Sequence, residues 1–143
     1  YVAVISCYAQ GTALLREASK EYKYDLHLDE IARIWKGGCI IRSKLLDPIA
    51  AAYKKNPALA NLLVDKNFAK IANTRSRGMR KVILTAIESG IPVLGLSAAL
   101  GYIDSYRAAR LPLNLTQAQR DYFGAHTYER TDKPGVFHTI WGE

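Results

Sequence analysis

The chain of 143 residues is long enough for one domain with a buried core, and its hydrophobic share of 49% is typical of globular proteins. No run of about 18 apolar residues is present, so we expect neither a membrane-spanning helix nor a membrane partner. The net charge of +7 comes from short basic groups between apolar positions. That pattern is typical of solvated helix faces, so we expect no nucleic-acid partner.

Helical spacing of apolar residues dominates the chain in sequence order. It predicts helices over seven segments, which are residues 1–22, 30–36, 40–54, 56–63, 67–89, 93–110 and 115–123. Asp29, Asn56 and Asn114 are candidate N-caps of three of these helices. Gly37-Gly38 is expected to end the second helix, and Pro48 to kink or split the third.

Helical spacing is lost from Ala125 onward, where a Lys-Pro-Gly turn interrupts the sequence. We therefore predict an all-α fold, a multi-helix domain over residues 1–143 with a helical core at 1–124 and an extended, irregular tail at 125–143. The tail is rich in aromatic residues, among them Tyr128, Phe137 and Trp141. Disordered tails are usually poor in such residues, so we expect this one to pack against a partner surface.

The two cysteines, Cys7 and Cys39, are too few for a disulfide framework. Reduced, buried thiols are the simpler interpretation, and they favour a cytoplasmic protein. The chain begins at Tyr1, and its only methionine is Met79. Because the first residues already have the pattern of a helix interior, we expect the chain to be a fragment of a longer protein.

Arg120 and His126 are the first candidates for a binding site. Arg120 falls in the last turn of the final predicted helix, and His126 lies just beyond Gly124, which should break it. The two side chains could converge on one anion, since a guanidinium offers a planar donor fork and histidine adds a second donor. Spacing alone favours the simpler alternative of a surface arginine and a capping histidine.

The sequence gives little support for a metal site, a cysteine nucleophile or a cofactor site. His27, His126 and His138 lack the short paired spacing of zinc ligands, so we predict no metal site. Neither cysteine has the surroundings of a nucleophile, because both lie among apolar residues. No glycine-rich fingerprint follows a strand, so we predict no cofactor-binding residue in this chain.

The run LNLTQAQRDYFGAHTYER at 113–130, followed by KPGVFHTIW at 133–141, resembles the C-terminal signature of the decarboxylating 6-phosphogluconate dehydrogenases. Further blocks agree in order and spacing, and these are SCYAQG (6–11), LLREASKEY (14–22), IWKGGCIIRS (34–43), NPALANLL (56–63), GIPV (90–93) and DSYRAARLP (104–112). The resemblance covers nearly the whole chain.

The resemblance implies an NADP-dependent enzyme of the pentose phosphate pathway that converts 6-phosphogluconate to ribulose 5-phosphate. It implies a homodimer whose catalytic lysine and glutamate and whose NADP-binding Rossmann domain lie upstream of Tyr1. We thus expect no catalytic residue here and no activity from the fragment alone. Arg120 and His126 match the pair that holds the substrate's phosphate in the neighbouring subunit's active site, and the tail matches the segment that threads through that subunit. The alternative is a structural helical assembly module that binds no ligand in isolation.

Overall fold

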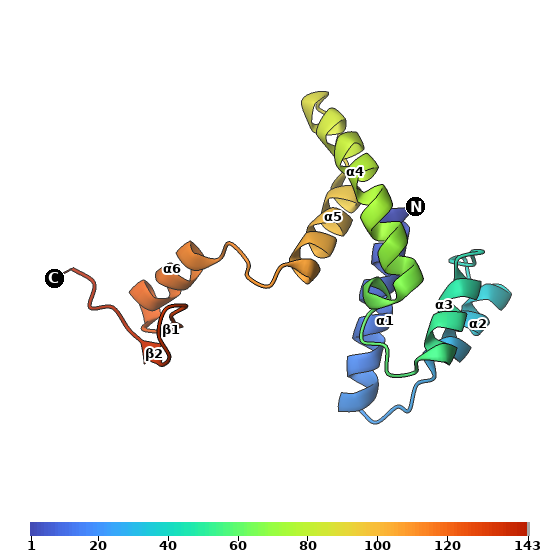
Figure 1. The fold of residues 1–143 in the computed structure, drawn as a ribbon, viewed down its shortest axis with the longest axis horizontal. Coiled ribbons are helices and arrows are strands. Elements are labelled where there is room, and N and C mark those ends of the chain that lie inside the picture. Colours follow the sequence, from blue (N-terminus) through green and yellow to red (C-terminus); the bar gives the residue numbers. More distant parts are fainter. Residues whose placement is uncertain (143) are drawn as a thin grey trace. The chain divides into compact units, whose positions relative to one another are not determined.

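The structure, a computed structural model, describes residues 1–142. These residues form six α-helices, one 3-10 helix and a pair of two-residue strands (Figure 1), which confirms the all-α prediction. The elements are α1 (Val2–Glu21), α2 (Leu28–Gly38), α3 (Leu46–Lys55), η1 (Leu62–Val64), α4 (Lys66–Glu88), α5 (Leu94–Arg107), α6 (Asn114–Gly124), β1 (Tyr128–Glu129) and β2 (Val136–Phe137).

The chain divides into two compact units. The first, the helical unit, spans Tyr1–Arg107 and holds α1 to α5, and the second, the C-terminal unit, begins at Ala108 and holds α6 and the two strands. The sequence predicts a helical core that runs through residue 124. That boundary stays a prediction, and by its internal contacts α6 groups with the segment that follows it.

The core of the helical unit forms where α1 packs against α4, α5 and η1, and where α2 packs against α3. Its fully buried side chains include Ile5, Leu46 and Ile49. Buried polar groups in this core are paired, as they must be to offset desolvation. The hydroxyl of buried Tyr53 donates to Thr12 Oγ1 at 2.8 Å, so α3 is tied to α1 by a hydrogen bond as well as by apolar packing.

The predicted helix over residues 40–54 is wrong in its first turn and a half. Residues 39–45 form turns, in which the Tyr8 hydroxyl donates to the Ile41 carbonyl at 2.6 Å, and α3 begins only at Leu46. Pro48 therefore lies in the first turn of α3, where its missing N–H costs no helical hydrogen bond. It neither kinks nor splits the helix.

The predicted short helix over residues 56–63 is also wrong. Asn56 ends α3 instead of beginning a helix, and only the single 3-10 turn η1 follows. The cap of that turn is the buried Asn61, whose Oδ1 accepts from the Leu63 N–H at 2.9 Å. Its Nδ2 donates to the Tyr102 hydroxyl at 2.6 Å, so this amide also joins η1 to α5.

Two of the predicted N-caps, Asp29 and Asn114, lie inside their helices. The cap positions are His27 and Leu113, and neither makes a side-chain cap hydrogen bond. The expectation of buried thiols is wrong as well, because Cys7 is exposed and Cys39 only half-buried.

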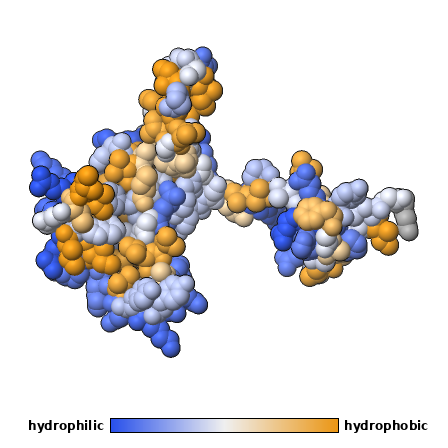
Figure 2. Space-filling model, turned by 180° about the vertical axis from the view of Figure 1, so that it is seen from behind, coloured by the Kyte–Doolittle hydropathy of each residue, from blue (hydrophilic) through white to orange (hydrophobic). Residues whose placement is uncertain are grey.

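Apolar side chains gather on the outside of the helical unit (Figure 2). They are concentrated where α4 ends and α5 begins, and those more than half exposed are Val82, Leu84, Ile87, Ile91 and Leu94. Figure 1 shows this end of α4 projecting beyond the rest of the unit. Exposed apolar residues gathered at one end of a unit are typical of an interaction face.

Candidate functional site

At the end of α6, the main chain turns so that the backbone of His126 lies next to that of Arg120. Ala125 follows the helix in the left-handed conformation, with φ of 47°, and its N–H donates to the Asp121 carbonyl at 3.0 Å. The chain then turns back, so that the His126 N–H donates to the Arg120 carbonyl at 3.5 Å. Both residues are exposed.

The His126 ring lies directly over Gly124. A Cβ added at Gly124 would be 2.6 Å from His126 Nε2, a distance that no real Cβ contact tolerates. The ring also meets Phe123 edge-on, with ring centroids 5.8 Å apart. A side chain at position 124 would therefore have to displace the imidazole, which lies near the end of the helix in contact with Phe123.

Arg120 points its guanidinium toward solvent with little to restrain it. Its Nη1 donates to Gln117 Oε1 at 3.3 Å, one turn earlier in α6. Among the carboxylates of residues 1–142, none forms an ion pair with it. A guanidinium in this state can offer its donor fork to an anion without first breaking an ion pair.

Asp121 is the residue at this site that the sequence analysis missed. It is fully buried and accepts hydrogen bonds from groups that follow the helix. These are Thr127 N at 3.0 Å, His138 Nδ1 at 2.8 Å, Thr139 N at 2.9 Å and Trp141 Nε1 at 3.0 Å. Three of the donors lie 17 to 20 residues away, and no local spacing in the sequence links them to Asp121.

The pKa of Asp121 reflects two opposing effects. Desolvation raises it, but hydrogen bonds from His138, Thr139 and Trp141 favour the charged form and together lower the pKa to about 2. The carboxylate is therefore ionised at every physiological pH. Because an ionised carboxylate can only accept, the proton in the bond with His138 resides on Nδ1.

The segment after α6 folds back into a small hairpin. Tyr128 pairs with Phe137 in the antiparallel register of β1 and β2, and the Tyr128 hydroxyl lies 2.7 Å from Thr139 Oγ1. Lys133 places its ammonium group 4.8 Å from the centre of the Phe137 ring. Tyr128 and Phe137 are thus half-buried within their own unit, whereas Trp141 keeps 42% of its surface exposed.

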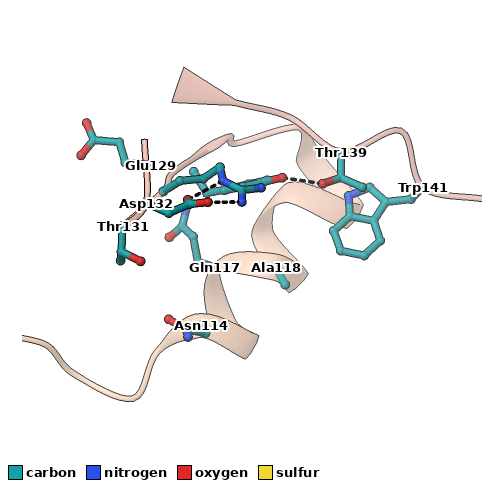
Figure 3. Close-up of a pocket in the computed structure, with 10 residues that line it drawn as sticks. Asn114, Gln117, Ala118, Glu129, Thr131, Asp132, Thr139 and Trp141 are labelled. Carbon is teal, nitrogen blue, oxygen red and sulfur yellow. Dashed lines mark hydrogen bonds and ion pairs between the residues drawn. The ribbon is translucent and has the colours of Figure 1, made fainter. Parts of the chain in front are cut away.

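A pocket of about 390 Å³ lies between α6 and this hairpin (Figure 3). Its lining is mixed, with the Arg130–Asp132 ion pair on the hairpin side and Trp141 at one end. Arg120 and His126 are not among its lining residues. Arg120, on α6, and His126, just after it, are therefore exposed residues that lie outside the pocket.

Two further properties concern the part of the chain that the structure describes. No group of three or more His, Cys, Asp or Glu side chains in residues 1–142 is arranged to hold a metal ion. Within the same residues, no helix combines the length and the apolar character needed to span a membrane.

Comparison with protein-family models matches residues 1–141 to the C-terminal domain of 6-phosphogluconate dehydrogenase. The chain belongs to the 6-phosphogluconate dehydrogenase family. This confirms the resemblance carried by the blocks listed above. Arg120 and His126 lie within the matched residues.

Similar 6-phosphogluconate dehydrogenases come from plants, bacteria and a protozoan. The chain is 57% identical over 141 residues to "6-phosphogluconate dehydrogenase, decarboxylating 1" of Spinacia oleracea, and 55% identical over 141 residues to the decarboxylating enzyme of Escherichia coli. Each match covers 99% of this chain, but only 29% of the first relative and 30% of the second. A solved structure of Plasmodium falciparum 6-phosphogluconate dehydrogenase matches with a TM-score of 0.92 and 48% identity, over 99% of this chain and 30% of that one. The chain therefore spans less than a third of these 6-phosphogluconate dehydrogenases.

Proposed function

We propose that this chain is the C-terminal substrate-binding and dimerisation part of an NADP-dependent 6-phosphogluconate dehydrogenase. The whole enzyme would oxidise and decarboxylate 6-phosphogluconate to ribulose 5-phosphate, in the pentose phosphate pathway. Family membership over residues 1–141 supports the proposal, as does the Plasmodium structure, which is described in complexes with NADP+ and with 6-phosphogluconate.

The contribution of this chain is to hold the substrate's phosphate with Arg120 and His126. The observation that carries this proposal is the turn after α6, which puts the His126 main chain on the Arg120 carbonyl and leaves both side chains exposed. The guanidinium supplies a fixed positive charge, and the imidazole supplies a second donor. Binding the phosphate anchors the substrate at a distance from the carbon that reacts, and such remote binding energy fixes the orientation of the reacting group.

The chemistry itself is assigned to the rest of the enzyme. The base, the acid and the NADP site would lie in the N-terminal part, so no residue of this chain is proposed as catalytic or as a cofactor ligand. The exposed apolar residues around the α4–α5 turn support a role in dimerisation. The cytoplasmic location stays a prediction, since the names of similar plant enzymes include chloroplastic forms.

A full-length enzyme tests the proposal. We define it as the native parent or as a chimera in which this chain replaces the matching part of the Escherichia coli relative. We expect it to oxidise 6-phosphogluconate with NADP. The Arg120→Ala/His126→Ala double variant should have a raised KM for 6-phosphogluconate. An unchanged KM in a double variant that still assembles would contradict the proposed phosphate site. The structural-module alternative is tested on the isolated chain, where it predicts no binding of 6-phosphogluconate in a fluorescence or NMR titration.

Mixed dimers test whether the pair acts across the dimer. Arg120→Ala subunits are mixed with subunits that lack the catalytic lysine of the N-terminal part. If the phosphate ligands reach the neighbouring active site, some heterodimers contain one intact composite site and regain activity. Mixtures that stay inactive while both parents dimerise would show that the pair acts within its own subunit.

A further inference from the structure

His126 must be kept beside Arg120 if the two residues are to bind one phosphate, as their proposed function requires. We propose that Asp121 is a positioning residue for substrate binding. It would act through His126, by fastening the returning C-terminal segment to the last turns of α6. Asp121 itself would not touch the substrate.

The first support is the conformation of the chain around His126. Ala125 and Thr127, on either side of it, both adopt left-handed backbone conformations, with φ of 47° and 63°. For residues with a Cβ such conformations cost energy and persist only where the surroundings impose them. His126 is therefore placed by contacts made by its neighbours.

Those contacts come from two side chains of α6. Asp121 Oδ1 accepts from the Thr127 N–H at 3.0 Å, and Gln117 Nε2 donates to the Thr127 carbonyl at 2.5 Å. Thr127 directly follows His126, and both its N–H and its carbonyl are thus hydrogen-bonded to side chains of α6. The direction in which the chain leaves His126 depends on these two bonds.

The second support is the position of Asp121 at the centre of the segment's contacts. Its other oxygen, Oδ2, accepts from Thr139 N and Trp141 Nε1, and His138 Nδ1 shares Oδ1 with Thr127. Burying a carboxylate is tolerated only when its lone pairs are satisfied in this way. One buried side chain therefore binds the segment at both its beginning and its far end.

The third support is electrostatic. Asp121 directly follows Arg120, yet its carboxylate is fully buried and occupied by the four donors of the returning segment. It consequently forms no ion pair with the guanidinium of Arg120, which remains exposed for an anion. A carboxylate at the same position without these hydrogen bonds would compete with the substrate's phosphate for the Arg120 guanidinium.

The test is a double-mutant cycle in the full-length enzyme. Asp121→Asn keeps the shape of the side chain but turns one acceptor into a donor. We expect KM for 6-phosphogluconate to rise about tenfold, the factor for losing the charge-assisted hydrogen bond of His126. KM for NADP and the dimer mass should stay unchanged. Asp132→Asn removes the same charge from an exposed residue that pairs with Arg130, and it serves as the matched control.

The decisive measurement is the same substitution in a His126→Ala background. A residue that acts through His126 has no further effect there, so Asp121→Asn should change KM by less than about twofold. If the two substitutions instead raise KM by factors that multiply in the double variant, Asp121 has a general structural role and the inference is overturned. Gly124→Ala gives an independent check, because its Cβ must displace the His126 ring while it leaves the Asp121 hydrogen bonds in place. It should reproduce the rise in KM.

Arg120→Ala and His126→Ala, measured in parallel, separate this inference from the proposed function. If both raise KM for 6-phosphogluconate and Asp121→Asn does not, the positioning role is refuted and the phosphate site stands. If neither Arg120→Ala nor His126→Ala raises KM for 6-phosphogluconate, both the phosphate site and the positioning role are refuted. Should Asp121→Asn not fold, the same cycle is run with Trp141→Phe, which removes one of the donors to Asp121. Its smaller effect must also vanish in the His126→Ala background.

Discussion

Replacing Arg120 by alanine in the full-length enzyme should weaken the binding of 6-phosphogluconate far more than that of NADP. The substitution is a clean perturbation, because Arg120 is exposed and its only described side-chain hydrogen bond is the 3.3 Å contact with Gln117. Water can replace the guanidinium at Gln117. The change therefore leaves no buried group without a partner and should not lower the stability of α6.

The magnitude follows from the chemistry of the contact. A phosphate monoester carries close to two negative charges near neutral pH, and a hydrogen bond to a charged group contributes about 1.5–3 kcal/mol. At about 1.4 kcal/mol per factor of ten, losing it should raise KM by roughly one to two powers of ten. The turnover number should fall less than kcat/KM, because the groups proposed for the chemistry lie outside this chain.

The assay is steady-state NADPH formation with each substrate varied in turn. Arg110→Ala is the matched control, since it removes the same charge from an exposed arginine of the C-terminal unit. An unchanged KM for 6-phosphogluconate in Arg120→Ala, or an equal rise in Arg110→Ala, would refute the reasoning. The second outcome would mean that net charge, and not a specific contact, attracts the substrate.

Three further predictions address the same region and the helical unit. His126→Ala should raise KM for 6-phosphogluconate less than Arg120→Ala, because the guanidinium offers a planar donor fork and a fixed charge, as steady-state NADPH formation would show. Gly78→Ala should raise the free energy of unfolding by about 0.5–1 kcal/mol in urea denaturation, because Gly78 lies within α4 and an added Cβ meets nothing within 4 Å. The stability that Asp121 provides is complete above the pKa of an unfolded aspartate, about 3.9. It should disappear as the pH falls toward the folded pKa of about 2. In a Trp35→Phe background, Trp141 emission should report that transition, and an Asp121→Asn variant should lack it.

Much of the helical unit can be predicted from the sequence because apolar spacing is a local signal. α1, α4 and α5 follow their predicted segments closely, and Gly37-Gly38 does end α2. The errors fall where tertiary contacts decide the local structure. Residues 40–45 have helical spacing, but they lie in turns, where the Tyr8 hydroxyl, distant in the sequence, donates to the Ile41 carbonyl.

The candidate site likewise contains residues that the sequence predicts and one that it does not. Arg120 and His126 stand out because their chemistry suits an anion and they flank a helix break, and the resemblance adds their role. Asp121 gives no such signal, since a single aspartate near the end of a helix reads as a solvated charge. Its importance depends on donors supplied by a segment that folds back from the far end of the chain. Only the folded arrangement brings them together.

The last one and a half turns of α6 combine three features. They contain the exposed Arg120, the buried Asp121 and the small Gly124. Successive residues of a helix point about 100° apart, so Arg120 can face solvent while Asp121 faces the returning segment. Gly124 lies one turn after Arg120 and leaves the space that the His126 ring occupies. The segment that Asp121 holds is also the segment that contains His126. In the proposed site, His126 and its support are therefore interdependent. A substitution that loosens the C-terminal segment should then weaken phosphate binding before it unfolds the protein.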